Sequence, residues 1–87
     1  MIDLHIAAEK EIGSRISQDE YQMALPAAQR KMAHIDNLSG IHHDEPYLAI
    51  LIAEAVKAQR FTRYLDAVND LRKQVRESDL EQRLAHL

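Results

Sequence analysis

The histidines are the residues whose type and spacing most resemble those of a metal-binding site. The chain has five His, and His42-His43-Asp44-Glu45 places four possible metal ligands in a row. Adjacent residues at a helix start point in different directions, so these four cannot all face one ion. A di-iron bundle needs Glu three residues before a ligating His, and zinc proteases need two His four apart. Neither pattern occurs, so we predict no metal site and no cofactor, although ion binding at His42 and His43 stays open.

The residues and loops typical of enzyme active sites are also absent from the sequence. The chain has no Cys, and it contains no Gly-rich phosphate loop and no nucleophile elbow. A helical chain of 87 residues also has little interior for both a core and a substrate pocket. We therefore predict that the protein is not an enzyme.

A basic row is the feature that favours nucleic-acid binding. Lys57, Arg60 and Arg63 are spaced by three, so on a helix they form a slanting row that could lie along phosphates. The net charge of −3 opposes this interpretation. Binding of a nucleic-acid backbone through Lys57, Arg60 and Arg63 is therefore kept as the alternative function.

The composition predicts one soluble helical domain over residues 1–87. Hydrophobic residues make up 46% and charged residues 29%, which is typical of a globular protein. The longest apolar run, Tyr47 to Ala53, is far shorter than the roughly 20 residues that span a bilayer. The first five residues lack the basic start and apolar run of a signal peptide. We expect a cytoplasmic protein with no membrane contact.

Capping signals divide the chain into four expected helices, an all-α small bundle. Asp3 caps the first, and Ser17 with Glu20 forms a capping box for the second. The apolar stripe of the second keeps its phase across Pro26, which favours one helix bent at that residue over a new helix start. The third begins at Asp44-Glu45-Pro46, after a turn at Gly40. A second capping box at Ser78 predicts a short fourth helix that carries the apolar side chains Leu80, Leu84 and Leu87.

The predicted helix from Pro46 to Glu77 changes its apolar face near its middle. The first half centres on Leu48, Leu51, Ile52, Ala55 and Ala58, and the second uses Phe61, Tyr64, Leu65, Val68, Leu71 and Val75. At 100° per residue the two faces differ by roughly 140°. Two alternatives follow. Either the chain bends near Arg60 and forms two helices, or one long helix packs against different neighbours at its two ends.

Protein binding is the function that these features favour. Phe61, Tyr64, Val68, Leu71 and Val75 repeat with the 3-4-3-4 spacing of a coiled-coil seam, and we call these five residues the seam. We expect a non-catalytic interaction module, such as a small inhibitor, immunity-type or adaptor protein, that binds a protein partner and self-associates through its long third helix. The predicted partner-binding residues, in which Tyr and Arg are typical interface types, are Arg60, Phe61, Arg63, Tyr64, Val68, Leu71 and Arg72. The identity of the partner, the choice between inhibitor and adaptor, and the oligomeric state stay open.

Overall fold

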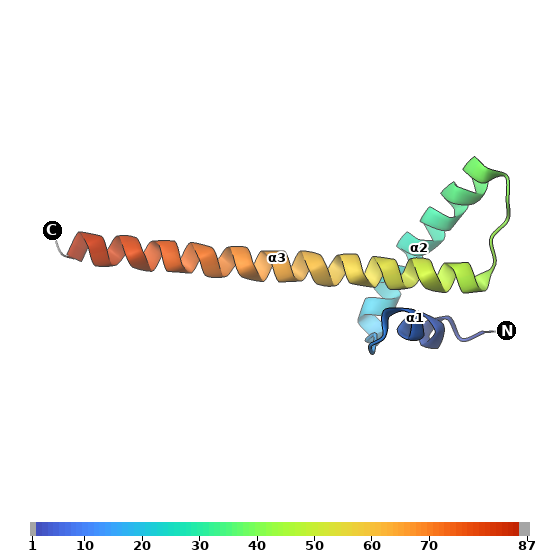
Figure 1. The fold of residues 1–87 in the computed structure, drawn as a ribbon, viewed down its shortest axis with the longest axis horizontal. Coiled ribbons are helices and arrows are strands. Elements are labelled where there is room, and N and C mark those ends of the chain that lie inside the picture. Colours follow the sequence, from blue (N-terminus) through green and yellow to red (C-terminus); the bar gives the residue numbers. More distant parts are fainter. Residues whose placement is uncertain (1, 86–87) are drawn as a thin grey trace.

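The described part of the protein is entirely helical, which confirms the all-α class. A computed structural model describes residues 2–85, and within that range three helices form, α1 (Leu4–Ile12), α2 (Gln18–Ser39) and α3 (Glu45–Ala85), without a strand (Figure 1). The expected count of four helices is wrong, because α3 continues through Ser78. Glu77 to Ala85 contains neither Gly nor Pro, so nothing there stops a helix. Leu87 lies outside the described residues.

The remaining helix ends lie where the local signals predict. The Asp3 carboxylate accepts from the backbone N–H of Ile6 at 3.1 Å, and Ser17 and Glu20 exchange both bonds of the capping box at 3.1 and 3.0 Å. Gly13 and Gly40 end α1 and α2 with φ of 73° and 70°, in the left-handed region that favours glycine.

Helix α2 passes through Pro26 without ending, as its continuous apolar stripe predicts. Pro26 itself is exposed, whereas Ala24 and Ala28 on the stripe are buried in the core of the protein. The helix therefore loses one hydrogen bond on its solvent side, while residues on both sides of Pro26 pack into the core.

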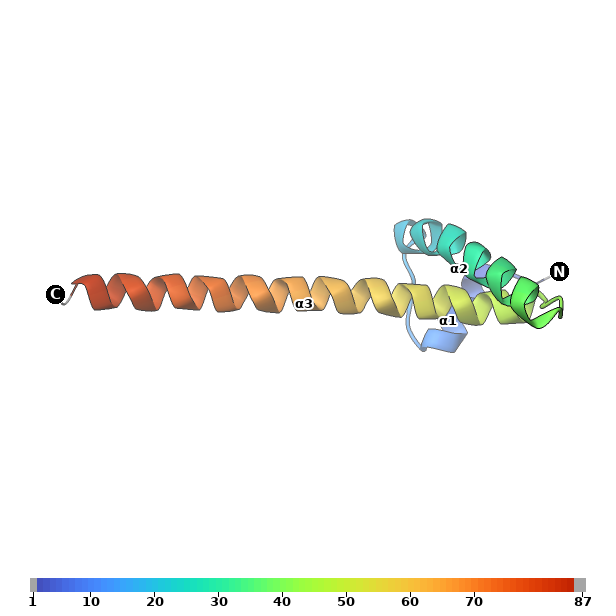
Figure 2. The ribbon, with the colours of Figure 1, turned by 90° about the horizontal axis from the view of Figure 1, so that it is seen from above.

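Helix α3 is a single helix, which decides between the two alternatives for the region around Arg60. Helices α1 and α2 each pack mainly against its first half. The second half extends beyond them, so that the molecule measures 67 × 28 × 17 Å (Figure 2). We call α1, α2 and residues 45–60 the body, and residues 61–85 the tail.

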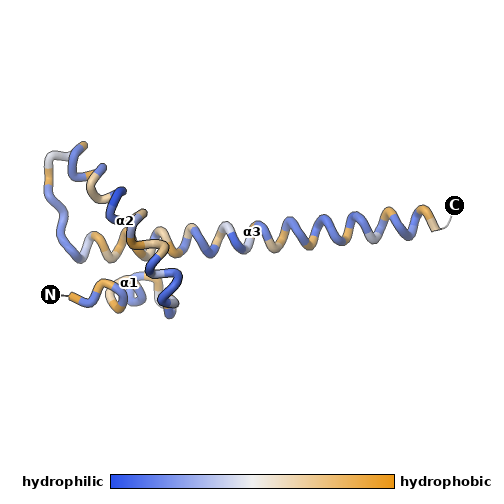
Figure 3. Tube along the Cα trace, turned by 180° about the vertical axis from the view of Figure 1, so that it is seen from behind, coloured by the Kyte–Doolittle hydropathy of each residue, from blue (hydrophilic) through white to orange (hydrophobic). Residues whose placement is uncertain are grey.

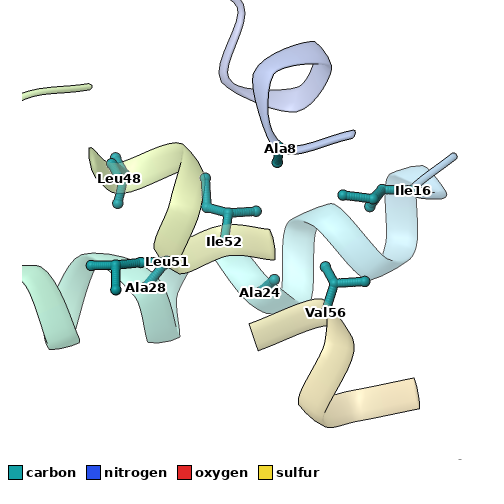
Figure 4. Packing of buried hydrophobic residues seen from close by; sticks show 8 residues of the cluster. All are labelled: Ala8, Ile16, Ala24, Ala28, Leu48, Leu51, Ile52 and Val56. Carbon is teal, nitrogen blue, oxygen red and sulfur yellow. The ribbon is translucent and has the colours of Figure 1, made fainter. Parts of the chain in front are cut away.

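The core of the body is small and is built where α1 and α2 cross α3. The largest fully buried side chains are Ile52 and Val56, both from α3. Alanines face them from the other two helices, which lets the backbones approach closely (Figure 4). The buried cluster consists of Ala8, Ile16, Ala24, Ala28, Leu48, Leu51, Ile52 and Val56.

Candidate interaction surface

The two apolar faces of α3 have different environments. In the body, Leu48, Leu51, Ile52 and Val56 are buried beneath α1 and α2. In the tail, no other helix of the described residues covers the seam, and apolar residues recur along an extended rod (Figure 3). Phe61 is 60% exposed, Tyr64 64%, Leu71 60% and Val75 65%, while Val68 is half-buried by its own helix. The structure thus leaves an apolar stripe uncovered on the half of α3 that extends past the body.

The seam lies on one side of the tail, turned away from the body. At 100° per residue its five members fall within a sector of about 80°. That sector is roughly 140° from the face that packs against α1 and α2, so the body does not block access to it. A shallow groove begins at Val68, Leu71 and Val75 and extends around the helix to Asn69, Arg72, Lys73 and Arg76.

The structure brings most of the predicted partner-binding residues to this side, but not all of them. Phe61, Tyr64, Val68 and Leu71 share the seam, and Arg72 flanks it. Arg63 is exposed but lies about 120° around the helix from the seam. Arg60 points to the body instead.

Arg60 fastens the connection between α1 and α2 to α3. Its Nε donates to Glu20 Oε2 at 2.8 Å, and Nη2 donates to Glu20 Oε1 at 3.2 Å and to the Arg15 carbonyl at 2.6 Å. Nη1 donates to the Ser14 hydroxyl at 2.7 Å. Arg60 is therefore engaged within the chain, at the start of the tail, and the basic row keeps only Lys57 and Arg63 as exposed members.

The ion pair with Arg60 gives Glu20 an unusual acidity. The hydrogen bond from Arg60, helped by the backbone N–H of Ser17, lowers the pKa of Glu20 from its ordinary 4.5 to about 2. Glu20 serves two roles at once, since the same carboxylate completes the capping box of α2. The capping role can be predicted from the sequence because Ser17 is only three residues from Glu20. The ion pair cannot be predicted in this way because Arg60 is 40 residues away.

We expect Arg60→Ala to lower the free energy of unfolding at pH 7 by about 1–2 kcal/mol, because four charge-assisted bonds are lost. The folded pKa of Glu20 lies below its unfolded value, so its stabilisation is complete above pH 4.5 and is lost as the pH falls towards 2. The wild type should therefore lose more stability than the variant over that range. Urea denaturation followed by circular dichroism measures both effects.

Arg63→Ala is the matched control, because Arg63 is one turn further along the same helix and exposed. Its free energy of unfolding should stay within about 0.5 kcal/mol of the wild type. Equal stability and equal acid dependence of Arg60→Ala and Arg63→Ala would contradict the role given to Arg60.

His43 takes a structural position in the connection between α2 and α3. Asp36 Oδ1 accepts from the backbone N–H of His43 at 3.1 Å and lies 2.5 Å from its Nδ1, and the His43 ring stacks on Tyr47 at 4.4 Å. The contact lowers the pKa of Asp36, mainly through the His43 hydrogen bond. His42 is 3.6 Å from the same carboxylate but almost fully exposed. Asp36 therefore closes the connection between α2 and α3.

Residues 2–85 assemble no group of three or more His, Asp or Glu side chains suited to holding a metal ion. His5 stacks on the Tyr21 ring at 4.5 Å, and its Nε2 lies 2.6 Å from the Ile16 carbonyl, so this histidine joins α1 to α2.

Comparisons with protein-family models, with curated proteins and with solved structures find no match to this chain. None of the helices α1 to α3, as described over residues 2–85, has the length and apolar character needed to cross a membrane.

Proposed function

We propose that the protein is a non-catalytic protein-interaction module that binds a helical protein partner along the seam of its tail. One observation carries the proposal: α3 continues as a single helix past the body while its apolar stripe turns away from α1 and α2. An apolar stripe that packed against α1 and α2 would continue on the same face of the helix as Leu48, Ile52 and Val56. The rotation by roughly 140° directs it to a neighbour outside the body.

The energetics of the tail favour a partner of this kind. The tail extends by about 37 Å at 1.5 Å per residue, and it lacks the packing against other helices that supplies most helical stability in proteins. Burial of a Phe, Leu or Val side chain contributes about 1.5–3 kcal/mol. A second helix laid along the seam therefore stabilises the tail and removes its exposed apolar surface from water.

The charge distribution supports a protein partner over a nucleic-acid backbone. Arg60, the middle member of the basic row, is held by Glu20 within the body. The acidic residues Asp66 and Asp70 follow within two turns and are exposed. A phosphate chain along this helix would meet carboxylates as well as Lys57 and Arg63, so the nucleic-acid alternative is the weaker proposal.

Photo-crosslinking at two positions of the tail tests the proposal. The photoreactive residue p-benzoylphenylalanine is placed at Tyr64, on the seam, or at Asp66, on the opposite side of the same helix. In cells that produce the protein, we expect a light-dependent protein adduct at position 64 and little at position 66. Absence of an adduct at 64, or equal adducts at both positions, would contradict binding along the seam.

A further inference from the structure

We infer that the partner of the seam is a second copy of this chain, packed antiparallel to the first. The inference rests on the proposed function and specifies the partner of the same surface. In the arrangement that fits best, the twofold axis passes between residues 69 and 70 of the tail. Tyr64 then packs against the partner's Val75, and Val68 packs against the partner's Leu71.

The sizes of the seam residues favour this orientation. The seam is bulky at its start, with Phe61 and Tyr64, and narrower at its end, with Val75 followed three residues later by Ser78. An antiparallel pair sets large against small, Phe61 against the partner's Ser78 and Tyr64 against the partner's Val75. A parallel pair sets each aromatic ring against its own copy and leaves two small serines facing each other. Alternation of large and small residues across an interface gives closer packing.

The charges at the two ends of the seam favour the same orientation. Lys57 is exposed just before the seam, and Asp79 and Glu81 are exposed just after it. An antiparallel pair brings Lys57 within about one turn of the partner's Asp79 and Glu81. A parallel pair sets Lys57 beside the partner's Lys57 and acidic residues beside acidic residues. Opposite charges across an interface select the orientation more than they raise the affinity.

The shape of the molecule leaves room for the second copy. The body covers the other side of α3, and within the described residues its last hydrogen bonds to this helix are those of Arg60, just before the seam begins. Overlap from residue 61 to residue 78 spans about 27 Å. Ten seam side chains, four of them aromatic, bury on the order of 1,000 Å² in total. That area is near the lower limit for stable complexes, so we expect a dimer that dissociates on dilution.

Disulfide trapping tests both the partner and its orientation. The sequence has no Cys, so a disulfide can form only at positions that are introduced. Tyr64→Cys and Val75→Cys are prepared separately, one with a tag that changes its size, then mixed and oxidised. We expect the mixed disulfide to dominate, because residues 64 and 75 face each other across the antiparallel pair, and each variant alone to remain largely uncrosslinked.

A second pair leaves all five seam side chains in place. Leu65→Cys and Arg72→Cys flank the seam, and the antiparallel pair brings each close to the other across the interface. We expect the same excess of mixed disulfide. Asp66→Cys, on the opposite side of the helix, should give only background crosslinking in either mixture.

The possible results separate the inference from the proposed function. Disulfides of Tyr64→Cys or Val75→Cys with themselves, without a mixed excess, overturn the antiparallel arrangement. Background crosslinking in both pairs, with a photo-adduct of position 64 to a different protein, overturns the second copy as partner while binding along the seam stands. Background crosslinking together with no adduct at position 64 overturns both.

Discussion

Replacing Leu71 by aspartate is expected to raise the dissociation constant of the dimer by at least about 100-fold. In the proposed dimer, Leu71 lies next to the twofold axis and packs against the partner's Val68, and each dimer contains the substitution twice. Each copy loses about 1.5–3 kcal/mol of apolar burial and places a carboxylate in an apolar contact. Because Leu71 is 60% exposed in the single chain, the body should fold normally. Analytical ultracentrifugation over a range of concentrations measures the constant.

The matched control is Asn69→Asp, which adds the same charge two residues away, at the far edge of the groove and about 120° around the helix from the centre of the seam. Its dissociation constant should stay within about twofold of the wild type. Two results would contradict the role of the seam: an unchanged constant for Leu71→Asp with native circular dichroism, or equal weakening by Asn69→Asp.

Replacing Ile52 by alanine is expected to lower the free energy of unfolding of the body by about 2–5 kcal/mol. Ile52 is fully buried where α1 and α2 cross α3, and it is one of the two largest fully buried side chains in the described residues. The loss combines missing apolar burial with the cavity left behind. Small domains have only a few kcal/mol in total, so a measurable part of the variant should unfold at room temperature.

Urea denaturation measures this loss, and the Leu71→Asp background keeps the unfolding transition monomeric. Ile50→Ala is the control, because Ile50 precedes Ile52 on the same helix but is 37% exposed. It should cost clearly less, about 1 kcal/mol. Equal losses for the two variants would show that the core does not lie where the structure has it.

The local parts of the fold could be predicted from the sequence. The caps at Asp3 and Ser17 and the turn at Gly40 depend on side chains within three or four residues, and all three are confirmed. The capping box at Ser78 has the same sequence pattern as the one at Ser17, but no helix begins there. The residues that precede the two serines explain the difference. Ser17 follows the end of α1 at Gly13, whereas Ser78 lies inside a run of helix-forming residues.

The long-range parts could not be predicted in the same way. Arginine is a typical interface residue, so the sequence predicts a partner-binding role for Arg60. Its hydrogen-bond partners Glu20, Ser14 and Arg15 are 40 to 46 residues away in the chain, so no local pattern indicates them. The pairing of Asp36 with His43 does not follow from the residues adjacent to His43 in the chain. A carboxylate in the last turn of α2, seven residues before the histidine, is the signal that could have indicated it.

The rotation of the apolar face was visible in the sequence, and the structure decides what it means. A break near Arg60 would have let the second face fold back onto the body. The continuous α3 removes that possibility for the described residues, since the tail projects away from α1 and α2 (Figure 1). The proposals for the seam follow from this one fact.

The molar mass in solution tests the central claim most directly, and size exclusion with light scattering measures it. One chain has a mass of 10.0 kDa. We predict a mass that rises from this value towards twice it as the concentration increases, with little change between low and moderate salt because the seam is apolar. A constant mass of one chain at every concentration up to about 1 mM would contradict the claim, since the seam would then contribute less than about 4 kcal/mol to self-association.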